Sequence, residues 1–211
     1  MNRNRILNFE HTKSFQYIHI PIKKHPKGSL ISQVKINQEE PWKVKIYGQL
    51  SIYKKLNAPH YKATLTLIKG ILDSTDDSFL NLSINSTKMI CNYLDIPFRY
   101  KIASQLNFHR GSIHKADDWA LTISKYLNAS TYFNAPSGYA IFDDHKYKKN
   151  GIKLTFIQPI LTPYSQSKRD NFVKGLSIID LLMFNSKEQV KQMIMSNSNL
   201  CSHTEMSQQK C

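Results

Sequence analysis

The chain has 211 residues, 41% of them hydrophobic and 21% charged, so it is long enough to bury a core and has the composition of an ordinary soluble protein. No window approaches about 18 uninterrupted apolar residues, and the N-terminus "MNRNRILNFEHTK" lacks an apolar stretch, so we expect neither a membrane span nor export, and a cytoplasmic location. The formal charge of +14 predicts an anionic partner. Because the lysines are spread along the chain, this partner is expected to be an anionic small molecule rather than nucleic acid.

The first half of the chain predicts a hairpin followed by helices. Residues 15–22 and 30–36 are rich in β-formers and are separated by Pro26 and Gly28, the pattern of a hairpin. Apolar residues then recur at helical spacing. The expected helices cover residues 42–56, 59–72 and 79–94, the last ending before Pro97.

The second half predicts further alternation of strands and helices. We expect a strand at 99–106, a helix around Trp119, a buried strand after Gly151 and a final helix over 177–194. Residues 196–211 have no periodicity, which predicts a frayed, disordered tail. The simplest architecture is a single α/β domain over residues 1–195, with a short mixed sheet and several packed helices.

Several common sites are excluded by spacing. The histidines and cysteines form no H-x-x-x-H, H-E-x-x-H or C-x-x-C pattern, so no metal is predicted. The glycines form no phosphate-binding loop, and "APSGYA" lacks the glycine that precedes the serine of a nucleophile elbow. No cofactor is indicated by the sequence.

Two adjacent acidic pairs have two interpretations each. Asp117-Asp118 and Asp143-Asp144 are able to hold a divalent ion that bridges a diphosphate. The alternative is local: the first pair complements a helix dipole, and the second caps the short turn before Lys146.

The segment "LSIIDLLMF" also has two interpretations. In the first, Ser177 caps a helix and Asp180, three positions later, accepts from backbone N–H groups. In the second, Asp180 and the helix N-terminus meet Tyr164 and Gln166 and hold a polar substrate. The two interpretations are compatible with each other.

Two further groups are candidates for substrate binding. The first group consists of Tyr132, Asn134, Ser137 and Gly138. These residues form either a simple turn or a loop that binds the substrate. In the other, Arg3 with Asn2 and Asn4 suits a phosphate or carboxylate, although a free terminus commonly frays.

A series of segments, taken together, resembles the WbqC-like family over residues 2–195. The segments are "NRNRI" (2–6), "HIPI" (19–22), "LISQVKI" (30–36), "PWKVK" (41–45), "SIYKKLNAPHY" (51–61), "YLDIPF" (93–98), "TYFNAPSGYAIFDDHKYKKNGIKLTF" (131–156), "PYSQ" (163–166) and "GLSIIDLLMFN" (175–185). The C-terminal half is the most specific part, because its motifs follow one another in the family's order.

The resemblance implies a bacterial protein of surface-polysaccharide gene clusters, above all those for the O-antigen of lipopolysaccharide. It implies transfer of glycine or another amino-acyl group onto an amino sugar or another sugar residue. For this chain we expect a nucleotide-linked sugar as the acceptor, with Asp180 as the candidate general base. The alternative is a noncatalytic sugar-nucleotide-binding or assembly protein. A nucleic-acid-binding module is favoured by charge alone.

One departure from the family concerns the N-terminus. Members usually carry a strand and a His-Gln-Pro-x-Tyr-Leu-Pro segment before the Asn-Arg-Asn element, whereas this sequence starts at Met1. We therefore expect an N-terminally truncated member, either inactive or dependent on a partner chain that covers the exposed sheet edge.

Overall fold

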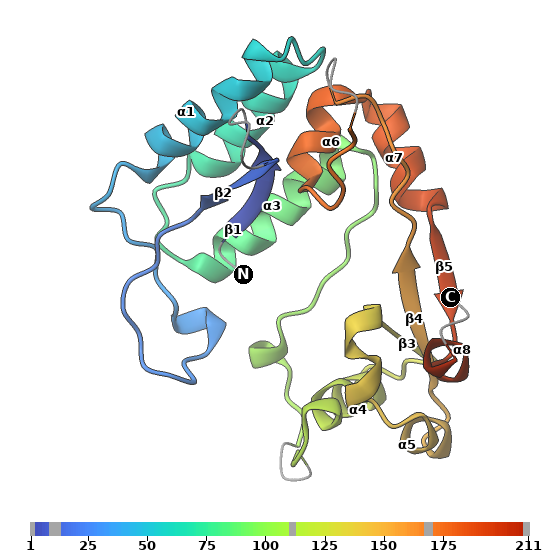
Figure 1. Cartoon of the computed structure of the whole chain (residues 1–211). Helices are drawn as coiled ribbons and strands as arrows, with labels where there is room; N and C mark the ends of the chain where they lie inside the picture. The colour runs from blue at the N-terminus through green and yellow to red at the C-terminus, as the bar shows by residue number, and fades with distance from the viewer. Residues whose placement is uncertain (1–2, 9–13, 110–112, 167–170, 209–211) are drawn as a thin grey trace. The chain divides into compact units, whose positions relative to one another are not determined.

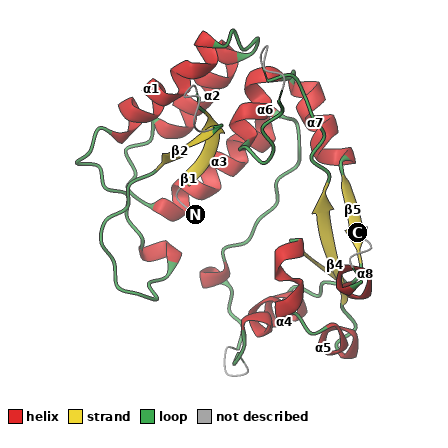
Figure 2. Ribbon diagram, in the orientation of Figure 1, coloured by secondary structure: helices red, strands yellow, loops and turns green. Residues whose placement is uncertain are grey.

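The structure is a computed structural model that describes residues 3–8, 14–109, 113–166 and 171–208. These residues form a mixed α/β fold with one two-stranded and one three-stranded sheet (Figures 1 and 2), which confirms the predicted fold class. Contacts divide the chain into two compact units. The first unit comprises Met1–Phe98 and Leu161–Ile194, and the second comprises Arg99–Ile160 and Met195–Cys211.

The first unit packs helices against a small antiparallel sheet. Its elements are β1 (Arg3–Leu7), β2 (Phe15–His19), η1 (Ile31–Gln33), α1 (Trp42–Lys55), α2 (Tyr61–Leu72), α3 (Phe79–Tyr93), α6 (Ile178–Phe184) and most of α7 (Lys187–Ser196). In the sheet, Arg3 lies opposite His19 and Leu7 opposite Phe15. Helix α2 packs against α1, α3 and α6, and α6 also contacts β1.

The core of the first unit follows from the helical spacing in the sequence. On α1, Ile46, Leu50 and Tyr53 recur at i, i+4 and i+7, and all three are buried. They meet Ile6 and Leu7 of β1 in one apolar cluster. The helix predictions for 42–56 and 79–94 are confirmed, and the helix expected from Pro59 begins at Tyr61.

One buried hydroxyl fastens α2 to α6. Thr64 has no exposed surface, and its Oγ1 donates to the Leu182 carbonyl at 2.7 Å. We expect Thr64→Val to lower the free energy of unfolding by about 1–3 kcal/mol, because the buried carbonyl loses its donor. Denaturant unfolding measures this, with the exposed Thr66→Val on the same helix as the control. Equal effects of the two variants would contradict the role of the Thr64 bond.

The hairpin prediction for 15–22 and 30–36 is wrong in its pairing. Strand β2 pairs with β1, and the two predicted segments meet only at a single bridge between Ile22 and Ile36. Prolines at 21 and 26 lack the N–H that a longer ladder needs. Part of the second segment instead forms the 3-10 turn η1.

Two other element predictions are also corrected. The strand expected at 99–106 is absent from this described segment, which contains the 3-10 turn η2 (Ala103–Gln105). The final helix is split into α6 and α7. The break follows from a reciprocal cap, in which Ser186 Oγ accepts from the N–H of Gln189 at 3.3 Å and Gln189 Oε1 accepts from the N–H of Ser186 at 2.8 Å.

The second unit is built on the strand order β3-β4-β5, with β3 parallel and β5 antiparallel to β4. Its elements are η2, α4 (Ala116–Tyr126), β3 (Thr131–Asn134), η3 (Pro136–Ile141), α5 (Asp144–Lys149), β4 (Lys153–Pro159), β5 (Ser198–Cys201) and α8 (His203–Ser207). Tyr147, Phe156 and Cys201 are fully buried in its core. The strand predicted after Gly151 corresponds to β4.

The segment expected to fray carries regular structure. Strand β5 supplies the second neighbour of β4, with Cys201 opposite Phe156. Helix α8 begins at a capping box, in which Ser202 Oγ accepts from the N–H of Glu205 at 3.2 Å. The polar composition of this segment gave no apolar periodicity from which β5 or α8 could be predicted. The pairing partner of β5, strand β4, lies some 40 residues earlier in the chain.

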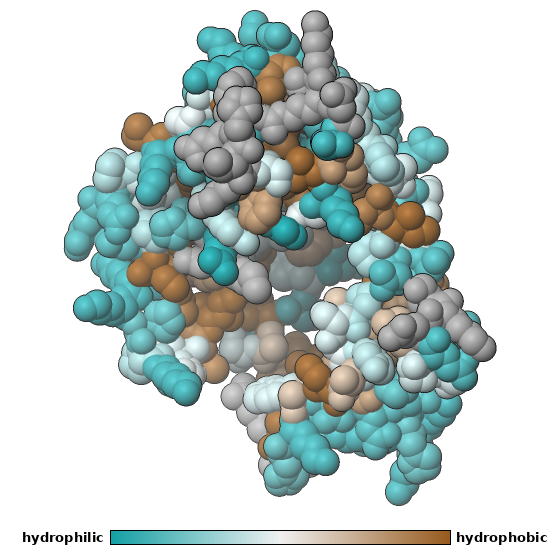
Figure 3. Space-filling model, in the orientation of Figure 1, coloured by the Kyte–Doolittle hydropathy of each residue, from teal (hydrophilic) through white to brown (hydrophobic). Residues whose placement is uncertain are grey.

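The visible surface is mainly hydrophilic, with smaller groups of apolar residues among the polar ones (Figure 3). Such scattered apolar residues are ordinary for a folded protein. Within the described parts of the chain, no helix combines the length and the apolar character needed to cross a bilayer.

Candidate functional site

A buried carboxylate and three hydrogen-bond donors form a polar cluster in the first unit. Asp180, on α6, has no exposed surface. Its Oδ1 accepts from Tyr53 Oη at 2.7 Å, and its Oδ2 accepts from Tyr164 Oη at 2.5 Å and from Gln166 Nε2 at 2.9 Å. We call these four residues the Asp180 network.

The network is anchored to the backbone on two sides. Gln166 Oε1 accepts from the N–H of Val173 at 2.7 Å, and Gln166 Nε2 also donates to the Val173 carbonyl at 3.1 Å. Tyr53 Oη accepts from the N–H of Leu7 at 3.2 Å. Because both oxygens of Asp180 and both ends of the Gln166 amide are engaged, the side chains are held in one arrangement.

The electrostatics of the network favour a proton on each tyrosine. Burial, followed by the Asp180 charge, raises the pKa of Tyr53 and of Tyr164 far above the usual range. Burial also raises the pKa of Asp180, although hydrogen bonds from Tyr164, Tyr53 and Gln166 oppose that rise. Asp180 is therefore a stronger proton acceptor than an ordinary aspartate.

Ser177 performs the predicted capping role, whereas Asp180 does not. Ser177 Oγ accepts from the N–H of Ile179 at 3.3 Å, and the Ser177 N–H donates to the Arg5 carbonyl at 2.9 Å. The expectation that the Asp180 carboxylate accepts from backbone N–H groups is wrong. The carboxylate turns inward to Tyr53, Tyr164 and Gln166 because they provide its acceptor bonds inside the core.

An apolar cavity of about 210 Å³ lies beside the start of α6. Ser177 lines it together with Asn4 of β1 and Ser83 and Ser86 of α3, and its other lining residues are apolar. The structure thus brings Asn4 and Ser177 to one cavity. Arg3 lies in the same strand, with its guanidinium 4.7 Å from the centre of the Tyr17 ring, and Asn2 lies outside the described residues.

The remaining predicted binding residues belong to the second unit. The Tyr132 ring is 5.7 Å from that of Tyr147 and 5.4 Å from that of Phe142, so it contributes to an aromatic cluster. Asn134 Oδ1 accepts from the N–H of Ala135 at 2.8 Å, which is a local turn contact.

Gly138 allows a close approach that another residue would obstruct. A Cβ at this position would lie 2.6 Å from Asn134 Nδ2. Asn134 and Gly138 therefore lie together, and Ser137 beside them is exposed on η3. This geometry matches the turn interpretation and leaves the binding interpretation as a prediction.

The first acidic pair, Asp117 and Asp118, forms salt bridges with Lys146. Lys146 Nζ lies 2.9 Å from Asp117 Oδ2 and also contacts Asp118 Oδ1. Asp118 Oδ2 accepts from the N–H groups of His114 and Lys115 at 2.7 and 2.6 Å. The Lys146 ammonium, followed by these N–H groups, holds the pKa of Asp118 well below its usual range, so the pair stabilises the start of α4.

The second acidic pair is also local. Asp143 Oδ1 accepts from the N–H of His145 at 3.0 Å at the start of α5, and Asp144 pairs with Lys148 at 2.6 Å. Among the residues that the structure describes, no three His, Cys, Asp or Glu side chains are grouped so as to hold a metal ion. The contacts of both acidic pairs therefore match the local interpretation.

Tyr53 is the network member that sequence reasoning missed. Its position on the buried face of α1 made it read as an ordinary core aromatic. A hydroxyl on a core-facing aromatic needs a partner when it is buried, and that requirement is the signal that could have revealed a polar site in the core.

The chain matches a protein-family model. The model of the WbqC-like protein family covers residues 1–192. The chain belongs to the WbqC-like protein family. The matched residues include parts of both units and all four residues of the Asp180 network. The match confirms the resemblance seen in the sequence motifs. Neither a curated protein nor a solved structure matches this WbqC-like chain.

Proposed function

We propose that this WbqC-like protein transfers glycine or another amino-acyl group to a nucleotide-linked sugar in the synthesis of bacterial surface polysaccharide, including the O-antigen of lipopolysaccharide. Family membership supports a role related to polysaccharide biosynthesis. The observation that carries the chemistry is the hydrogen bond from the hydroxyl of Tyr164, a half-buried residue, to the buried Asp180 carboxylate. We place the reaction in the cytoplasm, where nucleotide-linked sugars are made.

In the proposed step, Asp180 acts through Tyr164, because Asp180 itself has no exposed surface. An amine or hydroxyl of the sugar forms a bond to the acyl carbon, and the bond between that carbon and its carrier breaks, with the electron pair leaving on the carrier. The proton lost by the nucleophile passes to Tyr164 Oη, while the Tyr164 proton passes to Asp180 Oδ2 over the 2.5 Å contact.

The charge of the chain supports an anionic nucleotide-linked substrate. Lysine and arginine together number 29, against 15 aspartate and glutamate residues, and an excess of positive charge attracts diphosphates. Asn4 and Ser177 at the cavity, with Arg3 in the same strand, are our proposed contacts in the first unit. The second unit is considered by itself, and there we propose a separate group of sugar contacts formed by Tyr132, Asn134, Ser137 and Gly138.

The second candidate is a noncatalytic sugar-nucleotide-binding or assembly protein. The complete burial of Asp180 favours this role, because a carboxylate that is fully satisfied by Tyr53, Tyr164 and Gln166 also serves to fasten α6 to the core.

Replacing Tyr164 with phenylalanine tests the proton relay. With UDP-linked amino sugars as acceptors and either glycyl-tRNA or glycine with ATP as donor, mass spectrometry detects a product heavier by one glycyl residue. We expect Tyr164→Phe to lower the rate by about 10²–10⁴-fold, the usual contribution of a general acid–base group. Tyr126→Phe, on an exposed tyrosine of α4, is the control.

Two outcomes would contradict the transferase proposal. One is a wild-type product that Tyr164→Phe leaves unchanged in rate. The other is saturable binding of the nucleotide-linked sugars by the wild type with no product from either donor, which would support the noncatalytic role.

A further inference from the structure

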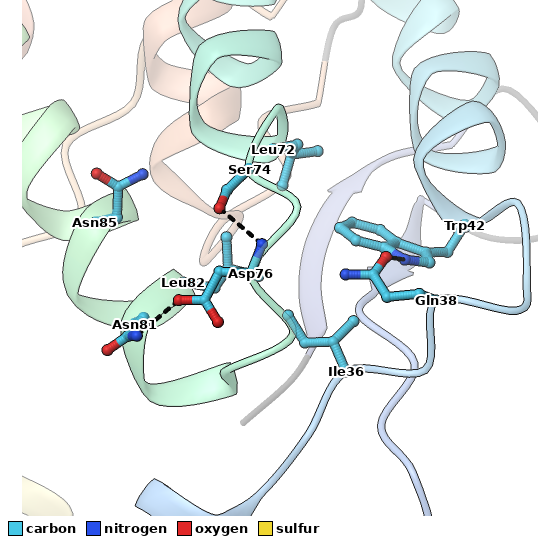
Figure 4. A pocket seen from close by; sticks show the side chains of 9 residues that line it. All are labelled: Ile36, Gln38, Trp42, Leu72, Ser74, Asp76, Asn81, Leu82 and Asn85. Carbon is cyan, nitrogen blue, oxygen red and sulfur yellow. Dashed lines mark hydrogen bonds between the residues drawn. The ribbon is translucent and has the colours of Figure 1, made fainter.

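A second pocket of the first unit, separate from the Asp180 network, has a volume of about 290 Å³. Three segments contribute to it: the loop before α1 and the first residue of that helix, the end of α2 with the loop that follows, and the first two turns of α3 (Figure 4). It shares only Leu72 and Leu82 with the cavity beside Ser177.

Apolar groups supply part of the pocket's lining. Ile36, Trp42 and Leu72 are 1%, 5% and 7% exposed, so the core holds them firmly. Leu82 of α3 completes this apolar part. These residues offer C–H and indole surface that matches the C–H groups of a sugar ring.

Amide side chains line the pocket from both sides, and each retains unused hydrogen-bonding capacity. Gln38 Oε1 accepts from Trp42 Nε1 at 3.3 Å, which leaves the Gln38 NH₂ group available. Asn81 Nδ2 donates to Asp76 Oδ2 at 2.7 Å, which leaves the Asn81 oxygen available. Within the described residues, the Asn85 amide has no hydrogen-bond partner at either end.

The existing bonds also hold two of the three amides in place, those of Gln38 and Asn81. Asp76 Oδ1 accepts from the N–H of Ser78 at 2.8 Å, and the Asp76 N–H donates to Ser74 Oγ at 3.1 Å. Asp76 therefore holds the Asn81 amide through its nitrogen, from a loop that is itself hydrogen-bonded (Figure 4). A preoriented pocket binds with a smaller entropic cost.

The lining selects among ligand classes by charge. Asp76 is the one charged residue among the nine that line the pocket, and it is acidic. A phosphate would meet a carboxylate there, which disfavours a nucleotide or a sugar phosphate. A sugar hydroxyl donates and accepts at the same atom, and it therefore suits amides that offer both donors and acceptors.

We propose that this pocket binds one uncharged hexopyranose ring. The volume lies just below the range of about 300–1,000 Å³ that is typical of small-molecule pockets, so it suits a single ring better than a nucleotide. The inference goes beyond the proposed function, since it requires only binding and no acyl donor. Inside a polysaccharide-synthesis protein, such a pocket holds a sugar residue on side chains that do not belong to the Asp180 network.

Fluorescence of Trp42 provides the test. The chain has two tryptophans, so Trp119→Phe leaves Trp42, which lines the pocket, as the sole indole. The probes are the methyl glycosides of glucose and galactose, their 2-acetamido counterparts, and glucose 1-phosphate. We expect a saturable change in emission with at least one methyl glycoside and weaker binding of glucose 1-phosphate.

A matched pair of variants assigns the signal to the pocket. In the same Trp119→Phe background, we expect Asn85→Ala to weaken binding about tenfold, equivalent to about 1.4 kcal/mol. Asn92→Ala, on an exposed asparagine of the same helix, is expected to leave affinity unchanged. Thermal melting of both variants checks that the fold is retained.

Three results would overturn the inference: no saturable signal with any methyl glycoside, equal affinities for the Asn85 and Asn92 variants, or tighter binding of glucose 1-phosphate than of methyl glucoside. None of these measurements involves Tyr164 or an acyl donor, so failure here is distinct from failure of the proposed transfer.

Discussion

Asp180→Asn is expected to lower the free energy of unfolding of the first unit by about 2–4 kcal/mol, because each buried donor that loses its acceptor costs about 1–3 kcal/mol. Asparagine keeps one oxygen but places an NH₂ group where Oδ2 now accepts from Tyr164 and Gln166. Denaturant unfolding followed by Trp42 emission, in a Trp119→Phe background, reports on this unit.

The pH dependence gives a second check on the Asp180 prediction. Since burial raises the folded pKa of Asp180, the contribution of this group to stability is complete below its unfolded pKa of about 3.9 and is lost as the pH rises through the folded pKa. The deficit of Asp180→Asn should therefore grow as the pH falls toward about 4.

The control for Asp180 is Asp73→Asn, which makes the same substitution at an exposed position at the end of α2. A double-mutant cycle with Tyr53→Phe should give a coupling energy of about 0.5–3 kcal/mol. If Asp180→Asn and Asp73→Asn unfold at the same denaturant concentration, the network does not stabilise the first unit.

Lys146→Met is expected to lower the unfolding midpoint of the second unit at neutral pH, since it leaves Asp117 and Asp118 without their cation. The folded pKa of Asp118 is depressed, first by Lys146. Its contribution to stability is therefore present above the unfolded pKa of about 3.9 and is lost as the pH falls through the folded pKa. The difference between Lys146→Met and its parent should shrink below about pH 4.

Trp119 emission in a Trp42→Phe background follows the second unit. The control is Lys148→Met on the same helix, because the Lys148 side chain is 70% exposed and pairs with Asp144 at the surface. A Lys146→Met deficit that stays constant from neutral pH to about pH 3 would show that the lost cation is not its cause.

The sequence predicted best the features that depend on residues close together in the chain. The apolar spacing of Ile46, Leu50 and Tyr53 located α1, and the serine at 177 located the start of α6. The proximity of Asp180 to Tyr164 and Gln166 was also predicted, since these residues lie within 16 positions of one another.

Features that depend on distant partners were not predicted. Strand β2 pairs with β1 rather than with the segment 30–36 that follows it, and β5 pairs with β4. The pocket at Trp42 gathers residues from three segments, each of which reads alone as an ordinary loop or helix. Local propensity carries no information on which of several compatible segments will meet.

The first unit is formed by two segments of the chain that are separated by most of the second unit, so its folding during synthesis has to wait for the later segment. Tyr53 leaves the ribosome 127 residues before Asp180, its hydrogen-bond partner. At about 5–20 residues per second, that interval lasts about 6–25 s. Throughout it, α1, α2 and α3 lack the apolar cover of Leu182 and Met183 from α6. Completion of the first unit must therefore follow the translation of Arg99–Ile160, the main segment of the second.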